Sequence, residues 1–404
     1  MSEKRRDNKG RILKTGESQR KDGRYLYKYI DSFGEPQFVY SWKLVATDRV
    51  PAGKRDCISL REKIAELQKD IHDGIDVVGK KMTLCQLYAK QNAQRPKVRK
   101  NTETGRKYLM DILKKDKLGA RSIDSIKPSD AKEWAIRMSE NGYAYQTINN
   151  YKRSLKASFY IAIQDDCVRK NPFDFQLNAV LDDTVPKTVL TGEQEEKLLA
   201  FAKADKTYSK NYDEILILLK TGLRISEFGG LTLPDLDFEN RLVNIDHQLL
   251  RDTEIGYYIE TPKTKSGERQ VPMVEEAYQA FKRVLANRKN DKRVEIDGYS
   301  DFLFLNRKNY PKVASDYNGM MKGLVKKYNK YNDDKLPHIT PHSLRHTFCT
   351  NYANAGMNPK ALQYIMGHAN IAMTLNYYAH ATFDSAMSEM KRLNKEKQQE
   401  RLVA

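Results

Sequence analysis

The sequence predicts a multidomain, mainly α protein. We expect a small α+β domain at residues 1–76, an all-α bundle at 82–178, and a mostly α domain with a small antiparallel sheet at 186–404. Three observations support this. The 404 residues exceed the usual size of one domain. Helical spacing of apolar residues prevails, whereas alternating patterns are short and few. Polar stretches with Gly, Asp or Pro separate the three parts.

The N-terminal part has two clear alternating stretches, Arg24–Ile30 and Gln37–Trp42, and a Gly-Glu-Pro turn lies between them. The stretch Ser59–His72 has apolar residues at helical spacing, at Leu60, Ile64, Leu67 and Ile71. We expect a small sheet, three-stranded in all, with one helix. The first 20 or so residues are polar and basic, and they are interpreted as a flexible arm.

The middle part reads as four helices. One begins near Leu84, and the others cover about Thr102–Lys114, Ser129–Met138 and Thr147–Ile163. Asn171-Pro172 marks the end of this run. Six basic residues are plausible contacts to phosphate, although solvated helix faces are an equally good interpretation: Lys97, Arg99, Lys100, Lys152, Arg153 and Lys156.

The C-terminal part is predicted to be mostly helical. A capping box, Thr191 to Gln194, opens its first helix. Three short stretches have the pattern of strands, at Leu242–Ile245, Tyr257–Glu260 and Gln270–Met273.

The charge balance favours a polyanionic partner. Lys and Arg number 71 against 53 Asp and Glu, which gives a net charge of +18, while 40% hydrophobic residues are enough for packed cores. Basic side chains that meet phosphates release counterions, so nucleic acid is the favoured partner. A protein that is merely basic is the alternative.

The sequence disfavours zinc-binding, secreted and membrane-spanning proteins. The four cysteines lie far apart without CxxC spacing, which argues against a zinc knuckle and fits a reduced, cytoplasmic setting. No signal peptide is expected after Met1. The sequence contains no run of 18 apolar residues, so we expect no membrane-spanning helix and no membrane partner.

The phrases TGLRISE (221–227) and PHSLRH (341–346) place two arginines where a phosphate could be held. Arg224 follows a Thr-Gly turn, and a guanidinium can grip phosphate oxygens with two N–H groups. A structural ion pair with Glu227 is the plainer interpretation. His342 and Arg345 share one face near a helix start, with Thr340 as the cap, and that end of a helix suits an anion.

Three further phrases supply proton carriers and a nucleophile. KTKSG (263–267) lies between two expected strands, so a hairpin would project Lys265, or less well Lys263. Gly367-His368 adds an imidazole, and Tyr377 and Tyr378 add two phenols. His346 lies four residues after His342, but Ser343 stands where zinc proteases have Glu. We expect no metal and no other cofactor.

Together these phrases resemble, in order and in local sequence, those of the tyrosine recombinase (phage integrase) family. The layout is most similar to integrases of Gram-positive conjugative transposons, or integrative conjugative elements. The resemblance implies an arm-site DNA-binding domain, a SAM-like core-binding bundle and a catalytic domain. It also implies a catalytic set: Arg224, Lys265, His342, Arg345, His368 and Tyr378.

The resemblance assigns roles to these residues. Tyr378 fits the Thr-x-x-x-Tyr-x-His phrase and would attack phosphorus, whereas Tyr377 would only pack. Lys265 would protonate the 5′ leaving oxygen, and the other four would stabilise the transition state. The bond energy is kept in a 3′-phosphotyrosyl link, so ATP is not needed.

The implied partners are double-stranded DNA at core crossover sites and arm sites, a homo-tetramer on two DNA sites, and a small excisionase helper. An apolar stripe near the C-terminus could dock on a neighbouring subunit or on its own domain: Phe383, Met387, Met390 and Leu393. A type IB topoisomerase and a catalytically silent DNA-binding regulator are the alternatives. Relaxation without partner DNA would favour the first, and binding without a covalent adduct the second.

Overall fold

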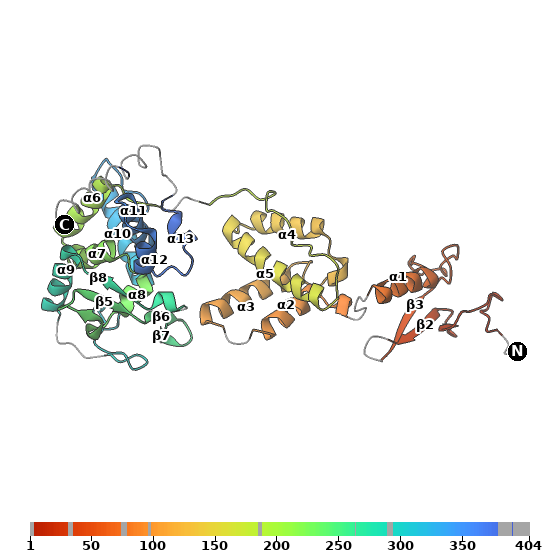
Figure 1. Cartoon of the computed structure of the whole chain (residues 1–404). Helices are drawn as coiled ribbons and strands as arrows, with labels where there is room; N and C mark the ends of the chain where they lie inside the picture. The colour runs from red at the N-terminus through yellow and green to blue at the C-terminus, as the bar shows by residue number, and fades with distance from the viewer. Residues whose placement is uncertain are drawn as a thin grey trace. The chain divides into compact units, whose positions relative to one another are not determined.

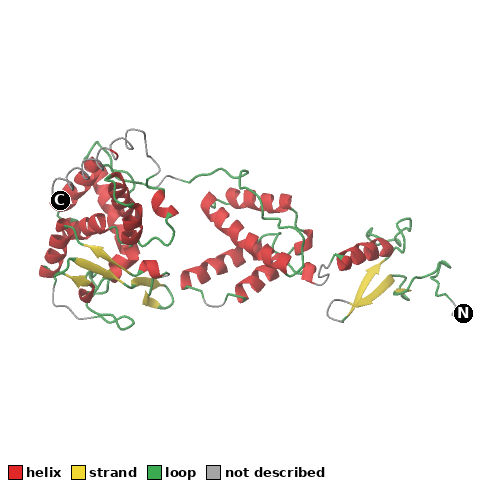
Figure 2. Ribbon diagram, in the orientation of Figure 1, coloured by secondary structure: helices red, strands yellow, loops and turns green. Residues whose placement is uncertain are grey.

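The computed structural model describes residues 4–30, 35–73, 79–95, 98–184, 188–262, 264–288, 294–378 and 390. The chain divides into two compact units, Met1–Val185 and Pro186–Ala404. Helices predominate and the strands form small antiparallel sheets, as Figures 1 and 2 show, so the predicted mainly α character with small sheets is confirmed. Among the described residues, no helix is both long and apolar enough to cross a membrane.

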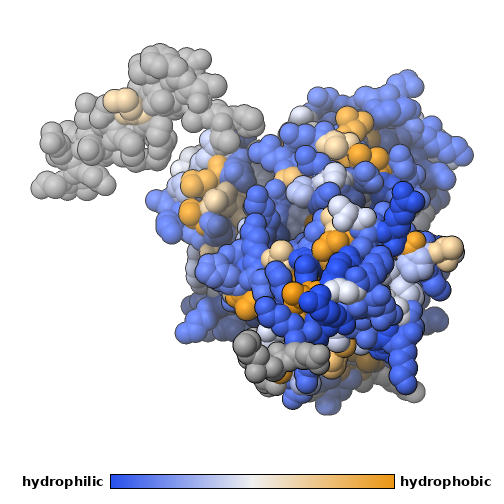
Figure 3. All heavy atoms as spheres, turned by 90° about the vertical axis from the view of Figure 1, so that its right-hand side faces the viewer, coloured by the Kyte–Doolittle hydropathy of each residue, from blue (hydrophilic) through white to orange (hydrophobic). Residues whose placement is uncertain are grey.

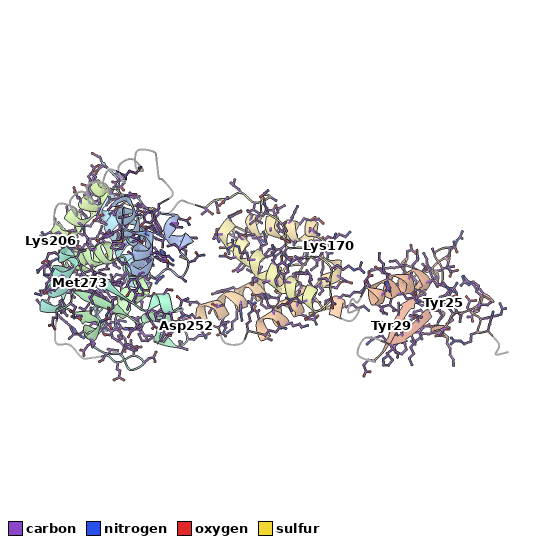
Figure 4. The ribbon with its side chains drawn as sticks, viewed as in Figure 1. Tyr25, Tyr29, Lys170, Lys206, Asp252 and Met273 are labelled. Atoms are coloured by element: carbon purple, nitrogen blue, oxygen red, sulfur yellow. The ribbon has the colours of Figure 1, made fainter. Side chains whose placement is uncertain are left out.

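The first unit begins with a three-stranded antiparallel sheet in the order β1-β2-β3, followed by one helix. Tyr25, labelled with Tyr29 in Figure 4, packs with Leu44, Leu60 and Ile64 into a small core. Ser59 caps the helix, and Glu62 closes the capping box. The elements are β1 (Glu17–Gln19), β2 (Tyr25–Ile30), β3 (Pro36–Ser41) and α1 (Leu60–His72).

One prediction for this region is wrong. Within residues 4–20 the chain is ordered rather than a flexible arm, because Arg11 bonds Asp7, Asp48 and the Tyr25 hydroxyl, each at 2.8 Å. Ile71 has the same helical spacing as the buried Leu60, Ile64 and Leu67, but it lies in the last turn of α1 and is 50% exposed. Sequence periodicity continues past the point where a partner surface ends.

The rest of the first unit is a helical bundle with its own core. Trp134, Phe159 and Phe173 pack together at its centre, with ring centroids of neighbouring pairs 5.7–5.8 Å apart. The helices are α2 (Leu84–Ala93), α3 (Lys100–Lys115), α4 (Pro128–Glu140) and α5 (Tyr145–Gln164), with short 3-10 turns η1 (Gly79–Lys81) and η2 (Ile123–Ser125).

Lys152 is not available for phosphate in this structure. It is 9% exposed, its ammonium binds the Phe175 carbonyl oxygen, and it lies 4.9 Å from the Phe175 ring centroid. Burial, with the charges of Lys156 and Arg153, lowers its pKa. Lys97 lies outside the described residues.

The second unit is built on the buried helix α7, against which α6, α9 and α11 pack. Ile215, Leu218 and Leu219 of α7 belong to one large apolar core. The helices are α6 (Gly192–Ala204), α7 (Tyr212–Thr221), α8 (Ile225–Gly230), α9 (Glu275–Ala286), α10 (Ala314–Tyr331), α11 (Pro341–Asn354), α12 (Pro359–Met366) and α13 (Ala372–Leu375), with 3-10 turns η3 (Ser209–Asn211), η4 (Leu233–Asp235) and η5 (Lys265–Gly267). Thr191 and Gln194 form the predicted capping box of α6.

The strands of this unit form two small sheets, β4-β5-β8 and β6-β7. The expected hairpin around Lys265 is therefore wrong: β7 pairs with β6, β8 pairs with β5, and Lys265 lies in the connection between the sheets. The alternation of apolar and polar residues located three of the strands, but it did not show which strands pair with each other. The strands are β4 (Leu236–Asp237), β5 (Leu242–Ile245), β6 (Gln248–Asp252), β7 (Gly256–Glu260) and β8 (Arg269–Pro272). Figure 4 labels Asp252, at the end of β6, and Met273, just after β8.

Candidate active site

The second unit has a cavity of about 640 Å³ whose lining gathers polar side chains from distant segments. Arg224 comes from the start of α8, His342 and Arg345 from α11, and His368 from the residue after the α12 cap. His346, Met373, Asn376 and Tyr377 also line the cavity, together with Val189 and Thr350. Four of the six predicted catalytic residues are thus brought together.

The α7–α8 turn places Arg224. Gly222 ends α7 with φ +63°, and a Cβ there would lie 2.4 Å from the Phe348 ring, so this position requires glycine. The next helix then begins directly after Arg224. The Arg224 guanidinium binds Glu227 at 2.6 Å and the Gly367 carbonyl oxygen at 2.7 Å. The structural ion pair and the position beside the cavity therefore coexist.

Helix α11 begins as the sequence predicts. The Thr340 hydroxyl accepts a hydrogen bond from the Ser343 amide at 3.2 Å, and Pro341 is the first helical residue. His342 is exposed and Arg345 only 4% exposed on the same helix. The Arg345 guanidinium donates to Gly222 at 2.6 Å and to the Met366 carbonyl oxygen.

Three arginines converge on the last carbonyl groups of α12. Arg269 donates to the Ile365 oxygen at 2.6 Å, Arg345 to Met366, and Arg224 to Gly367. The last carbonyls of a helix lack partners within it and carry partial negative charge, so cations are stabilised there. Gly367 has φ +60°, and a Cβ would lie 3.0 Å from the Arg269 guanidinium. This helix end orders the guanidinium groups before any anion arrives.

Glu227 is the anion that balances this cluster. Its carboxylate accepts from Arg269 at 2.9 and 3.1 Å, and it also pairs with Arg224. Burial alone would raise the pKa of Glu227, but the hydrogen bonds and charge of Arg269, with Arg224 and Arg345, lower it to about 2. Burial and the charge of Arg224 lower the pKa of Arg345 to about 9, so its guanidinium still carries charge at neutral pH.

His368 is buried and held from one side. Its Nδ1 lies 2.9 Å from the Thr374 hydroxyl, and both residues are 5% exposed or less. Burial and the charges of Arg345 and Arg224 lower the pKa of His368 to about 4. The imidazole is therefore neutral at pH 7 and can still donate one hydrogen bond.

The two tyrosines lie differently. Tyr377 lines the cavity and its hydroxyl bonds His346 Nδ1, and burial with the nearby Cys349 raises its pKa to about 12. The Tyr378 hydroxyl instead donates to the Met357 carbonyl oxygen at 2.5 Å, and Tyr378 does not line the cavity. Burial raises the pKa of Tyr378 as well.

Lys265 is exposed at the start of η5 and is not among the cavity residues. Lys263 lies outside the described residues, as does the predicted apolar stripe except Met390, which is 62% exposed. The sequence did not single out Arg269 as a site residue, and it indicated no catalytic role for His346. The signal for Arg269 was its alternation with buried Val271 on β8, which puts a charge on the inner face of a strand.

One group of described residues has the spacing of metal ligands: Asp235, Asp246 and His247, whose ligand atoms lie within 4.8 Å of one another. Both ring nitrogens of His247 already have partners, Asp246 at 2.5 Å and the Gly230 carbonyl oxygen at 2.7 Å. None of the three lines the arginine cavity.

Comparison with known proteins identifies the family. Residues 188–385 match the phage integrase family, and residues 1–71 match the DNA-binding domain of Tn916 integrase. The chain is 98% identical over 405 residues to the transposase from transposon Tn1545 of Streptococcus agalactiae serotype V and to that from Tn916 of Enterococcus faecalis, with all of each chain covered. This chain belongs to the phage integrase family of tyrosine recombinases.

A solved relative supports the same assignment for the larger part of this recombinase. The Tn1549 transposon integrase in complex with a circular intermediate DNA is 65% identical, with a TM-score of 0.74, over 77% of this chain and 99% of that one. The same integrase in complex with transposon right-end DNA is 64% identical, with a TM-score of 0.74, over 78% of this chain and 100% of that one.

Proposed function

We propose that this tyrosine recombinase cuts and rejoins DNA at specific sites, and so integrates and excises a mobile element such as a conjugative transposon. The observation that carries the proposal is the set of Arg224, Arg345, His342 and His368 around one cavity. The near identity to transposases of two transposons supports the type of element.

The scissile phosphate would bind between the two arginines of the cavity. Each guanidinium has five N–H donors, and the bonds to the protein use only some of them. Because the arginines are already ordered by α12 and Glu227, little reorganisation is needed as charge develops on phosphorus. In the tautomer where Nδ1 accepts the Thr374 hydroxyl proton, His368 keeps its own proton on Nε2 and can donate it to a phosphate oxygen.

Tyr378 is the proposed nucleophile, with Tyr377 as a packing residue. The segment after Thr374 must then rearrange when DNA binds, because the Tyr378 hydroxyl is bonded to Met357 in this structure. Its raised pKa means that the phenol proton must pass to a base during attack. His342, exposed at the cavity, is the proposed proton carrier.

Lys265 is the proposed acid for the 5′ leaving oxygen. Its exposed side chain at the start of a short turn between two sheets supports this role, because neither sheet covers the ammonium group. Gly267 keeps the turn tight, since a Cβ there would lie 2.3 Å from Pro262.

The remaining parts would serve DNA binding. Residues 1–76 are proposed to read arm sites, residues 82–178 to bind the crossover duplex as a SAM-like bundle, and residues 186–404 to perform the chemistry. Four protomers would assemble on two DNA sites, in the cytoplasm, with an excisionase as helper. We propose that neither metal nor ATP is required, because the arginine cluster supplies the positive charge.

Strand exchange tests the proposal against its alternatives. The protein is incubated in EDTA with two labelled duplexes, one of which carries the joined ends of the element. Recombinant strands that cross between duplexes are the expected result. Relaxation of a supercoiled plasmid without any exchange would instead indicate a topoisomerase, and tight binding without cleavage a regulator.

A further inference from the structure

The turn that carries Lys265 is held by buried residues rather than by its own exposed side chain. The face of the molecule shown in Figure 3 is mostly hydrophilic with small, separate apolar groups, so exposure alone does not distinguish a functional lysine. A general acid must be held near the oxygen that it protonates, because a displacement of about 1 Å can cost about 100-fold in rate. The backbone of the turn must therefore be fixed by the residues that pack against it.

Arg269, four positions after Lys265, is a buried residue that contacts this turn. Its side chain is 0% exposed. The guanidinium donates to the Gly267 carbonyl oxygen at 3.1 Å, to the Ile365 carbonyl oxygen at 2.6 Å, and to both carboxylate oxygens of Glu227 at 2.9 and 3.1 Å. A buried charge is tolerated only where its hydrogen bonds are satisfied, so the bond to the turn belongs to the set that keeps this guanidinium in place.

The same turn packs against the C-terminal end of α12. A Cβ at Gly367 would lie 3.0 Å from the Ser266 carbonyl oxygen and 3.0 Å from the Arg269 guanidinium, so the turn and the helix end are in close contact. His368 follows Gly367 directly and lines the arginine cavity. The backbone of the turn is therefore fixed beside the cavity, although the Lys265 side chain does not line it.

We propose that Arg269 is a positioning residue for the general acid. It holds the Lys265 turn against the end of α12, so that the ammonium group meets the 5′ oxygen of a phosphate bound in the arginine cavity. The inference rests on the proposed function, in which Lys265 gives a proton to that oxygen as its bond to phosphorus breaks and the bond from Tyr378 to phosphorus forms. Arg269 would not touch the reacting atoms itself, because its side chain is buried.

A DNA substrate with sulfur in place of the 5′ leaving oxygen tests this link, because a thiolate leaves without an acid. The full-length chain is assayed for the ratio of adduct formation rates on the sulfur and oxygen substrates, which does not depend on how much of a variant is folded. Arg269→Lys should raise this ratio by about 10- to 100-fold. Its single ammonium group cannot replace the guanidinium bonds to Glu227, Gly267 and Ile365 together. Equal slowing on both substrates would overturn the proposal and leave the proposed strand exchange standing.

Arg345→Lys is the matched control. Arg345 is buried in the same cluster and donates to Gly222 and to Met366 at the same helix end, and among the described residues it makes no hydrogen bond to the Lys265 turn. This variant should slow both substrates alike and leave the ratio at the wild-type value. An increase as large as that of Arg269→Lys would contradict the proposal, because any loss within the cluster would then have the same effect.

Lys265→Ala supplies the second arm and separates this inference from the proposed function. In the Lys265→Ala background, Arg269→Lys should change the ratio no further, because a positioning residue acts only through the group that it positions. A further increase would contradict the proposal. A wild-type ratio in Lys265→Ala would overturn it together with the acid role of Lys265. Absence of any adduct with the wild-type chain would overturn the proposed function, and the inference with it.

Discussion

At the residue scale, Thr374 contacts His368, and we expect it to affect the proposed chemistry only by positioning that imidazole. The buried hydrogen bond of 2.9 Å orients the imidazole ring. Thr374→Val should slow formation of the covalent adduct by about 10- to 100-fold, as loss of an orienting partner does at other sites. The affinity of Thr374→Val for DNA should be unchanged. Thr374→Ser, which keeps the hydroxyl, should form the adduct at the wild-type rate. A wild-type rate in Thr374→Val would show that the hydroxyl does not orient His368.

Lys265 can be tested with a substrate whose leaving oxygen is replaced by sulfur. Lys265→Ala should slow cleavage of normal DNA by about 10²- to 10⁴-fold, the usual contribution of a general acid. A 5′-bridging sulfur leaves as a thiolate without an acid, because thiols are far more acidic than alcohols. The variant should therefore cleave the sulfur substrate at the wild-type rate. If the sulfur substrate restored cleavage by Lys263→Ala and not by Lys265→Ala, the general acid would be Lys263.

Single residues also show where sequence reasoning stops. Thr340, Pro341, His342 and Arg345 were predictable because capping and helical spacing are local. The place of the Tyr378 hydroxyl was not, because it depends on the Met357 carbonyl, 21 positions away.

At the element scale, the C-terminus of α12 is the feature that orders the site. Arg224 reaches Gly367 across 143 positions, and Arg345 reaches Gly222 across 123. No local pattern encodes such pairs. The sequence motifs singled out Arg224 and Arg345, which line one cavity, but did not predict that they share one helix end with Arg269. For the same reason it predicted strands around Lys265 but paired them wrongly.

The α7–α8 turn can be tested by adding one methyl group. Gly222→Ala should destabilise the catalytic unit by about 1–3 kcal/mol or more, because the residue has φ +63° and its Cβ would meet Phe348. Gly319→Ala is the matched control. It lies within α10 with nothing near its added Cβ, so it should stabilise by roughly 0.5–1 kcal/mol. Denaturant unfolding of both variants measures the difference, and equal midpoints would contradict this account of the turn.

At the scale of the whole molecule, His368 should make stability depend on pH. Its pKa is about 4 in the fold against 6.5 for the unfolded group, so the unfolded chain binds more protons between these values. The contribution is complete above pH 6.5 and is lost as pH falls, by about 2 kcal/mol at pH 5. His368→Gln should lose less stability than wild type between pH 7.5 and pH 5 in urea unfolding. Identical losses would mean that His368 is not held neutral.

Separate cores support a division of labour within the chain. The N-terminal sheet and the helical bundle have distinct apolar clusters, and the catalytic unit has its own. A fragment from Met82 to Ala404 should therefore fold, cleave core-site DNA and lose only arm-site binding. Gel-shift assays with arm and core duplexes measure this. Loss of core-site cleavage in a folded fragment would contradict the proposed division.

Covalent trapping tests the central claim most directly. Nicked duplexes that carry the element's end are incubated in EDTA with wild type, Tyr377→Phe and Tyr378→Phe, and adducts are resolved on a denaturing gel. The account predicts adducts with wild type and Tyr377→Phe and none with Tyr378→Phe. An adduct that persists in Tyr378→Phe but disappears in Tyr377→Phe would make the cavity tyrosine the nucleophile and contradict the account.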